Sequence, residues 1–271
     1  MLRLRRLSRG IAAAGLAFAL AACASGTDEE YEERPVESLY NEAVDELEAE
    51  NYGAAARAFD EVERQHPYSV WATKAQIMAA YAQYLANAYD EAIVALDRFI
   101  QLHPGNKDAA YAYYLKALSY YEQISDVERD QRMTQRALDS LQEVVTRFPD
   151  TDFARDAELK IDLTRDHLAG KEMRIGRYYL NQGHYLAAVN RFKVVVDTYQ
   201  TTTHVPEALH RLTEAYMALG LHEEAEKTAS VLGYNFPGSE WYIDSYEMME
   251  GEVVRTPEEQ AKLEEPWWKL F

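Results

Sequence analysis

The amino-acid sequence predicts an all-α protein built as a solenoid of five repeated helix pairs. Between Val36 and Trp241, prolines occur at only five positions, and the long stretches between them are rich in Ala, Leu, Glu and Tyr. Proline is excluded from helix interiors and often follows a helix end. Five stretches align without gaps, four of them with one of these prolines near the end, and each carries an alanine at the same place. We therefore expect helices separated by short turns.

The first segment, residues 1–22, has the layout of an export signal. Four arginines precede an apolar run from Ile11 to Ala22. This run is too short to cross a bilayer, which takes about 20 residues. A positive start followed by a short apolar run is typical of a cleavable signal peptide.

Cys23, the only cysteine of the chain, follows this run directly. A single cysteine excludes an intrachain disulfide and the common cysteine-based zinc sites. The sequence Leu20-Ala21-Ala22-Cys23 resembles the lipobox of bacterial lipoproteins, in which the cysteine is acylated and becomes the first residue after cleavage. Several acyl chains give stable membrane anchoring. The alternative is an ordinary signal peptide followed by a chance cysteine.

Residues 23–36 are small and acidic, which predicts a flexible tether between the lipid and the folded part. Ala24 and Ser25, rather than an aspartate, follow the cysteine. By resemblance to enterobacterial sorting signals, this favours the outer membrane.

The net charge limits the possible partners. Residues 1–22 contain four arginines and no acidic residue, so their removal changes the formal net charge from −18 to −22. Such an acidic chain is repelled by nucleic acid phosphates and by anionic lipid surfaces. We therefore expect no nucleic acid partner, and membrane association through the lipid on Cys23.

The repeat is defined by residues in phase. Five gap-free units begin at Tyr52, Tyr89, Thr134, Tyr185 and His222. Three residues into each unit stands an alanine, at Ala55, Ala92, Ala137, Ala188 and Ala225. Each unit ends on a ring, at His66, His103, Phe148, Tyr199 and Phe236. A small residue stands in the preceding helix of each unit, at Ala43, Ala80, Ala117, Gly176 and Thr213. It precedes the alanine by twelve residues in four units and by 20 in repeat three.

This spacing resembles the tetratricopeptide repeat. The resemblance implies a right-handed α-solenoid of five tetratricopeptide-like helix pairs, in which small residues let the paired helices approach closely. The units are 37, 45, 51 and 37 residues apart, against about 34 for an ideal repeat. Some of the extra residues lie in the charged segment 122–133, which is either a functional insertion or a solvated loop. The remaining extra residues precede repeat four, and their sequence predicts a lengthened helix through residues 152–170.

No catalytic or metal-binding motif is present in the sequence. His66 and His103 stand where other units carry Phe or Tyr, so packing explains them better than ligand binding. We expect no enzymatic activity, no cofactor and no metal.

The repeat register predicts a concave surface instead. In the tetratricopeptide family the first helix of each pair lines the inner face, at positions −3, +1 and +4 from the small residue. In repeats one to three the substrate-groove candidates are Tyr40, Val44, Ile77, Tyr81, Tyr84, Tyr114, Leu118 and Tyr121. An aromatic groove suits extended peptides. The alternative is that some of these tyrosines pack between repeats, and we expect about half to be exposed.

Several segments together point to a narrower family. The lipobox, the tether, the five repeats and the segments "HPYSVWATKAQ", "YDEAIVALDRFIQLHPG" and "RYYLNQGHYLAAVNRF" resemble the BamD family, lipoproteins of the outer-membrane β-barrel assembly machine. The resemblance implies a non-catalytic scaffold anchored to the inner leaflet of the outer membrane and facing the periplasm. It implies partners of three kinds: the periplasmic domains of a BamA-type barrel subunit, other lipoproteins of the machine, and unfolded outer-membrane proteins.

The resemblance also divides the chain between these partners. It assigns substrates to the N-terminal half and the barrel subunit to the C-terminal half, where Arg191 aligns with a family arginine implicated in that contact. The expected domains are a signal peptide at 1–22, a lipidated tether at 23–36, repeats one to three at 37–150, repeats four and five at 151–250, and a tail at 251–271.

Two alternatives stay open. The aromatic tail residues Trp267, Trp268 and Phe271 either cap the last repeat, which is the favoured interpretation because terminal repeats need a cover, or bind a partner. The chain as a whole would alternatively be another periplasmic repeat lipoprotein, such as a pilotin or an envelope-constriction coordinator. The latter usually has an N-terminal coiled coil, and the sequence shows none.

Overall fold

A computed structural model describes residues 33–251 of the chain, and this part contains helices and no strand. The helices are α2 (Val36–Glu48), α3 (Tyr52–Gln65), α4 (Val70–Leu85), α5 (Tyr89–Leu102), α6 (Ala109–Tyr121), α7 (Arg132–Arg147), α8 (Asp152–Asn181), α9 (Tyr185–Thr198), α10 (Val205–Ala218), α11 (His222–Asn235) and α12 (Glu240–Glu250). The signal peptide, Cys23 and the tail with Trp267, Trp268 and Phe271 lie outside the described residues.

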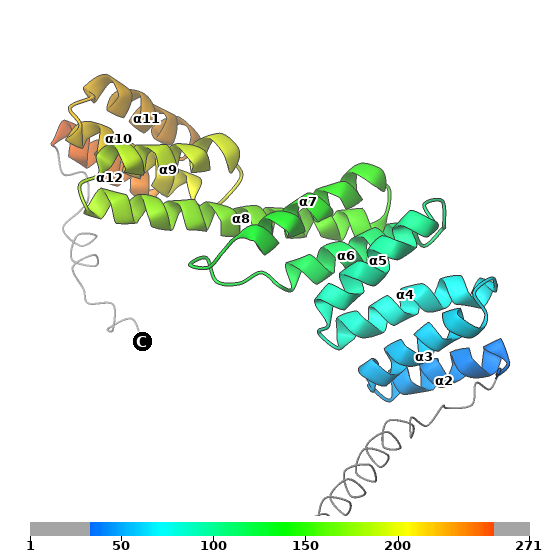
Figure 1. The fold of residues 1–271 in the computed structure, drawn as a ribbon. Helices are drawn as coiled ribbons and strands as arrows, with labels where there is room; N and C mark the ends of the chain where they lie inside the picture. Colours follow the sequence, from blue (N-terminus) through cyan, green and yellow to red (C-terminus); the bar gives the residue numbers. More distant parts are fainter. Residues whose placement is uncertain (1–32, 252–271) are drawn as a thin grey trace, which may run out of the picture.

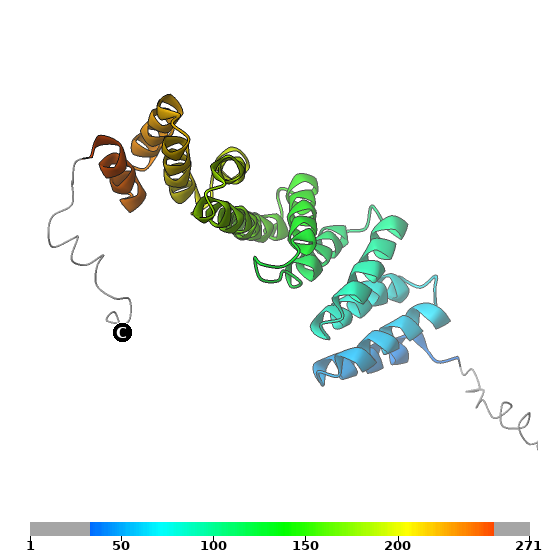
Figure 2. The same ribbon diagram turned by 60° about the vertical axis from the view of Figure 1, so that its left-hand side comes forward.

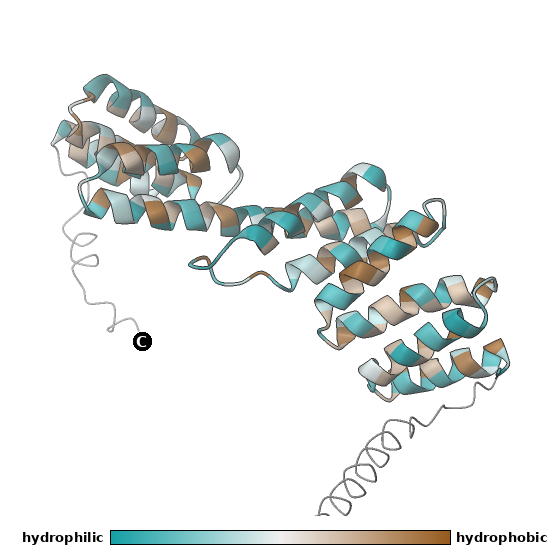
Figure 3. Ribbon diagram, in the orientation of Figure 1, coloured by the Kyte–Doolittle hydropathy of each residue, from teal (hydrophilic) through white to brown (hydrophobic). Residues whose placement is uncertain are grey.

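Consecutive helices pack as five pairs, from α2 with α3 to α10 with α11, and α12 follows the last pair. The pairs succeed one another along an elongated array, with α2 at one end and α12 at the other (Figure 1). Apolar and polar residues alternate along the helices (Figure 3), as expected when one face of each helix packs on its neighbours. The predicted all-α solenoid of five helix pairs is confirmed.

Turn chemistry explains where helices begin and end. Ser69 and Thr151 cap α4 and α8, because their side chains accept hydrogen bonds from the backbone N–H groups of Ala72 (3.0 Å) and Ala154 (3.2 Å). The tight turns inside pairs four and five need positive φ, which Gly183 and Gly220 supply (+73° each). Glu50 and Asn87 adopt positive φ in the turns of pairs one and two.

The residues that define the repeat form the core. The five in-phase alanines, Ala55, Ala92, Ala137, Ala188 and Ala225, are fully buried. In pair four, Gly176 lies against the buried ring of Phe192 so closely that a Cβ at position 176 would collide with the ring. The small residues therefore set how closely the two helices of a pair approach.

The 30-residue helix α8 belongs to two cores. Ala157 and Ile161 in its first half pack with Leu141 of α7, whereas Met173 and Leu180 in its second half pack with Phe192 of α9. The predicted lengthened helix is confirmed, and Figure 2 shows it as the link between the two halves of the array. The predicted domain boundary at 150/151 coincides with the start of this shared helix.

Helix α12 covers the end of the array. The Trp241 ring lies 5.4 Å from the His210 ring and 5.4 Å from the Arg211 guanidinium carbon, both on α10. Ser245 is buried and its Oγ lies 2.8 Å from Nδ1 of His210. Burial lowers the pKa of His210, and the nearby positive charge of Arg211 lowers it further. The cover that a terminal repeat needs is thus supplied within residues 240–250.

None of the helices between residues 33 and 251 combines the length and the apolar character needed to cross a bilayer.

Candidate functional site

The first helices of the N-terminal pairs form one continuous face. The backbones of α2 and α4, of α4 and α6, and of α6 and α8 approach each other closely, whereas the backbones of the second helices α3, α5 and α7 do not. In a curved stack the inner elements lie closer together than the outer ones. The inner face is therefore built by α2, α4, α6 and the first half of α8, which is where the sequence predicts the groove.

Tyrosine hydroxyls on this face bond to carboxylates of the next pair. Tyr84 of α4 donates to Oε1 of Glu122 at the end of α6 (3.2 Å), and Tyr114 of α6 donates to Asp156 of α8. Lys160 forms an ion pair with Asp156 (2.9 Å) and lies over the Tyr121 ring, 5.7 Å from its centre. These contacts fix the orientation of the rings across successive pairs.

The pKa shifts match these contacts. Burial and the neighbouring Glu122 raise the pKa of Tyr84 to about 12. Burial and the hydrogen bond to Asp156 raise the pKa of Tyr114 further. Burial opposes ionisation of Asp156, but the bonds from Tyr114 and Lys160 outweigh it and lower the pKa of the carboxyl. At neutral pH each pair is thus a neutral phenol donating to a carboxylate, which is a charge-assisted hydrogen bond.

Six of the eight predicted lining residues are half-buried: Val44, Tyr81, Tyr84, Tyr114, Leu118 and Tyr121. Tyr40 and Ile77 differ, because both are buried in the core. The Tyr40 ring packs 5.4 Å from Phe59 and 4.8 Å from Trp71. Both residues stand three before the small residue of their helix, and their side chains pack in the core. Tyr114 stands at the same position in pair three and stays half-buried, so the position alone does not decide exposure.

Two leucines of α8 extend this face, and the sequence reasoning missed them. Leu159 and Leu163 are 67% and 61% exposed, one turn apart on the helix that carries Asp156 and Lys160. Leu163 also lines a hollow of about 290 Å³ with Tyr121 and others. The repeat register treats this segment as a spacer before repeat four. The available signal was a pair of leucines four residues apart in the charged stretch "AELKIDLTRD".

The charged segment after α6 is docked on α8. Lys171 Nζ donates to the carbonyl oxygen of Glu128 (3.0 Å), and Arg174 forms an ion pair with the Glu128 carboxylate. Gly170 of α8 lies next to this segment: a Cβ there would be in ordinary contact with Val127 at 3.7 Å, and would come closer, 3.2 Å, to Nε2 of His204. The insertion is therefore more than a solvated loop, because it makes a hydrogen bond and an ion pair with α8.

Arg191 lies on α9 at the edge of this region. Its Nη1 donates to Oε2 of Glu172 on α8 at 3.1 Å, and the arginine side chain is 42% exposed. Glu172 also lines a hollow of about 440 Å³ together with Lys171, Tyr199 and the docked loop. Burial and the charge of Glu172 raise the pKa of Tyr199. The guanidinium is thus oriented by an acid and still open to solvent.

Between residues 33 and 251, no three His, Cys, Asp or Glu side chains are grouped so that they would hold a metal ion. The described surface presents apolar and aromatic side chains on the inner face and charged side chains around Arg191.

Comparison with known proteins reveals relatives over most of the chain. Residues 32–232 match a family, YfiO, described as outer membrane lipoprotein. The chain is 52% identical to the outer membrane protein assembly factor BamD of Caulobacter vibrioides over 255 residues, covering 93% of this chain and 84% of the relative. It is 49% identical to BamD of Rickettsia prowazekii over 248 residues, covering 92% and 98%.

Lower similarity is found to a further relative and to a solved structure. BamD of Neisseria meningitidis serogroup B is 35% identical over 271 residues, covering 94% of this chain and 96% of the relative. Among solved structures, the TPR2AB domain of yeast Sti1 in complex with an Hsp90 peptide aligns with a TM-score of 0.42 and 13% identity, covering 80% of this chain and 82% of that one.

The hydrogen bond from Tyr114 is expected to contribute to stability. The Tyr114→Phe variant should lose about 1 kcal/mol of unfolding free energy at pH 7, a typical loss for a partly exposed hydrogen bond to a charged group. Because the pKa of Tyr114 is raised in the folded state, this contribution is complete below pH about 10, the ordinary tyrosine value. It is lost as the pH rises above that, so the difference between the two proteins should shrink.

Urea unfolding followed by circular dichroism at pH 7 and above pH 10 measures this. Tyr68→Phe is the control, because the Tyr68 side chain is fully exposed. Equal stability losses in the two variants, or a difference that does not change with pH, would contradict the assigned hydrogen bond.

Proposed function

Because this chain belongs to the BamD family of outer membrane lipoproteins, we propose that it is a non-catalytic scaffold of the β-barrel assembly machine. In this role it promotes insertion of β-barrel proteins into the outer membrane, docked on the periplasmic domains of the barrel subunit. The relatives at 49–52% identity are named assembly factors, which favours this role over that of a pilotin or an envelope-constriction coordinator.

The observation that carries the substrate-binding part is the apolar inner face. Half-buried tyrosines are held by hydrogen bonds from one pair to the next, and Leu159 and Leu163 continue the face onto α8. Rings that are already fixed lose little conformational entropy when a ligand binds. Such a face suits an unfolded polypeptide that offers apolar and aromatic side chains.

Docking on the barrel subunit is proposed at Arg191 and the neighbouring hollow. The ion pair with Glu172 holds the guanidinium in one place while leaving part of it exposed. A carboxylate of the partner would find an oriented, planar donor there, which is a favourable arrangement for an arginine hot spot. The substrate face and this docking site are connected by α8, so both are occupied at once without competition.

Membrane attachment is proposed through lipid on Cys23, at the inner leaflet of the outer membrane. The residues from Cys23 to Pro35, treated as a coil, reach roughly 20 Å. The tether would keep the array near the membrane, where it meets the barrel subunit and the other lipoproteins of the machine.

The Arg191→Glu variant should bind the periplasmic domains of the barrel subunit at least about tenfold more weakly. The change replaces an oriented hydrogen-bond donor by a carboxylate, which repels the carboxylate expected on the partner. Binding is measured by surface plasmon resonance, with helicity checked by circular dichroism. Lys193→Glu, at an exposed position of the same helix, has the same charge change. A similar loss in both variants would show that overall charge matters instead of Arg191. No loss in either would remove Arg191 from the interface.

A glutamate in the groove should weaken substrate binding. Leu159→Glu or Leu163→Glu should lower the affinity for a labelled C-terminal peptide of an outer-membrane barrel protein about tenfold. Each variant loses the binding free energy that comes from burying one leucine side chain against the peptide. Fluorescence anisotropy measures the affinity. Leu186→Glu on α9 is matched to Leu159 in residue type and exposure (67% each). If all three variants bind equally well, the α8 leucines are not part of the site.

Changing Cys23 to Ser removes the acylation site. The variant should therefore move from the outer-membrane pellet to the soluble fraction after cell lysis, since the chain has no other expected membrane contact. Immunoblotting of the two fractions measures this. Continued sedimentation with the membranes in the absence of the barrel subunit would contradict the lipid anchor.

A further inference from the structure

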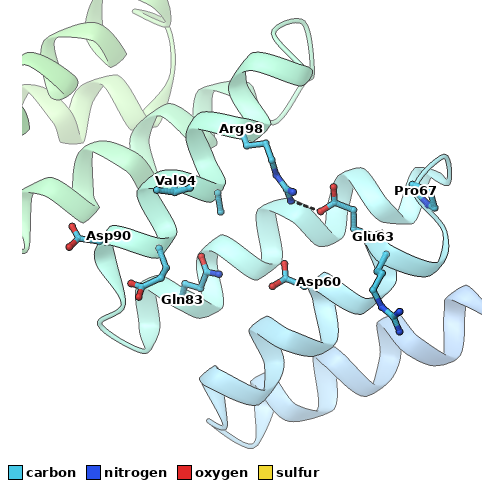
Figure 4. A pocket seen from close by; sticks show the side chains of 10 residues that line it. Asp60, Glu63, Pro67, Gln83, Asp90, Val94 and Arg98 are labelled. Carbon is cyan, nitrogen blue, oxygen red and sulfur yellow. Dashed lines mark hydrogen bonds and ion pairs between the residues drawn. The ribbon is translucent and has the colours of Figure 1, made fainter. Parts of the chain in front are cut away.

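A cleft of about 840 Å³ lies between α3 and α5, on the outer side of pairs one and two. It exists because α4 packs against both α3 and α5 while the backbones of α3 and α5 stay apart. Its walls include Asp60, Glu63 and Pro67 on one side and Val94 and Arg98 on the other. Figure 4 shows Asp60 and Gln83 facing the space between the helices.

The cleft has hydrogen-bond acceptors that lack donors. The Oε1 atom of Gln83 is buried and has no hydrogen-bond partner in the described part of the chain. The carboxylates of Asp60 and Glu91 are exposed to solvent and make no hydrogen bond or ion pair with other described residues. The buried oxygen of Gln83 without a donor costs free energy, and the cost is recovered when a donor arrives.

The basic residues of the cleft do not supply these donors. Arg98 reaches across to Glu63, with its Nη2 at 2.5 Å from Oε2 (Figure 4). Arg64 bonds to Glu61, which lies outside the cleft lining, through its Nε at 2.6 Å. Four acidic residues therefore line the cleft against two arginines that already have acidic partners.

Partial burial shifts the pKa of one of these acids, Asp60. It raises the pKa of Asp60, the charge of Arg98 opposes this, and the neighbouring Glu63 adds to it. A further cation beside Asp60 would lower this pKa again.

The rest of the lining is apolar. Val94 is 70% exposed, and Ala95 and Pro67 also face the cleft. An aliphatic chain would contact these groups while a terminal cation reaches the acceptors, as long basic side chains do in partly buried sites. Because the acceptors are spread over α3, α4 and α5, a planar guanidinium with five N–H donors satisfies more of them than a lysine ammonium.

We propose that the cleft between α3 and α5 receives an arginine side chain of a partner polypeptide, flanked by apolar residues that pack on Val94. The guanidinium donates to Gln83 Oε1 and pairs with Asp60 and Glu91. This surface lies on the second helices of the pairs, away from the groove on the first helices and from Arg191. It therefore gives the protein a further interaction site that stays accessible when the substrate and barrel-subunit sites are occupied.

The probe is the labelled peptide acetyl-Ala-Leu-Arg-Leu-Ala-amide, with a counterpart in which neutral citrulline replaces arginine. Anisotropy with the full chain in detergent should show the arginine peptide binding at least about tenfold more tightly, because citrulline keeps the shape and loses the charge. The Asp60→Asn/Glu91→Gln variant should lose the preference. The Asp45→Asn/Glu48→Gln variant, with the same charge change on exposed positions of α2, should keep it.

The side-chain amide resonance of Gln83 gives a second, local readout, and it should shift on addition of the arginine peptide. Three results would overturn the proposal: equal binding of the citrulline peptide, an equal loss in the α2 variant, which would indicate bulk charge attraction, or binding that leaves the Gln83 resonance unmoved. Because neither the groove leucines nor Arg191 is altered, each outcome is separable from a failure of the proposed scaffold role.

Discussion

Close approach of the two helices within each pair is the constraint on which the rest of the structure depends. Fully buried alanines, and Gly176 against Phe192, allow this approach in every pair. The first helices then contact one another from pair to pair while the second helices stay apart. The closer approach of the first helices thus produces two surfaces, a continuous inner face and a cleft between α3 and α5 on the outer side.

Helix α8 turns two groups of repeats into one scaffold. Its first half completes the core under α7 and extends the inner face, and its second half forms the first helix of pair four. The loop after α6 docks on its middle, where Lys171 donates to the carbonyl oxygen of Glu128. A continuous helix curves only gently, so the inner face and the region around Arg191 keep a nearly constant relation.

Acidic side chains serve different purposes on the different surfaces. On the inner face Glu122 and Asp156 orient tyrosine rings, and Glu172 orients Arg191. In the outer cleft, Asp60 and Glu91 have no such partner among the described residues. The large negative charge of the chain is therefore not uniform solvated surface. Part of it orients neighbouring side chains, and part lines the outer cleft, where we propose that a basic partner binds.

The sequence by itself determined the helix pairs, their number, the buried alanines and the lengthened helix before repeat four, because small and apolar residues at fixed spacing have one good way to pack. It also selected most of the inner lining. Only the tertiary structure decided that Tyr40 and Ile77 are buried, that Leu159 and Leu163 join the face, and that α12 covers the last pair. The reason is physical: periodicity says which side of a helix is apolar, but exposure depends on how near the next pair lies, and that distance is a property of the whole stack.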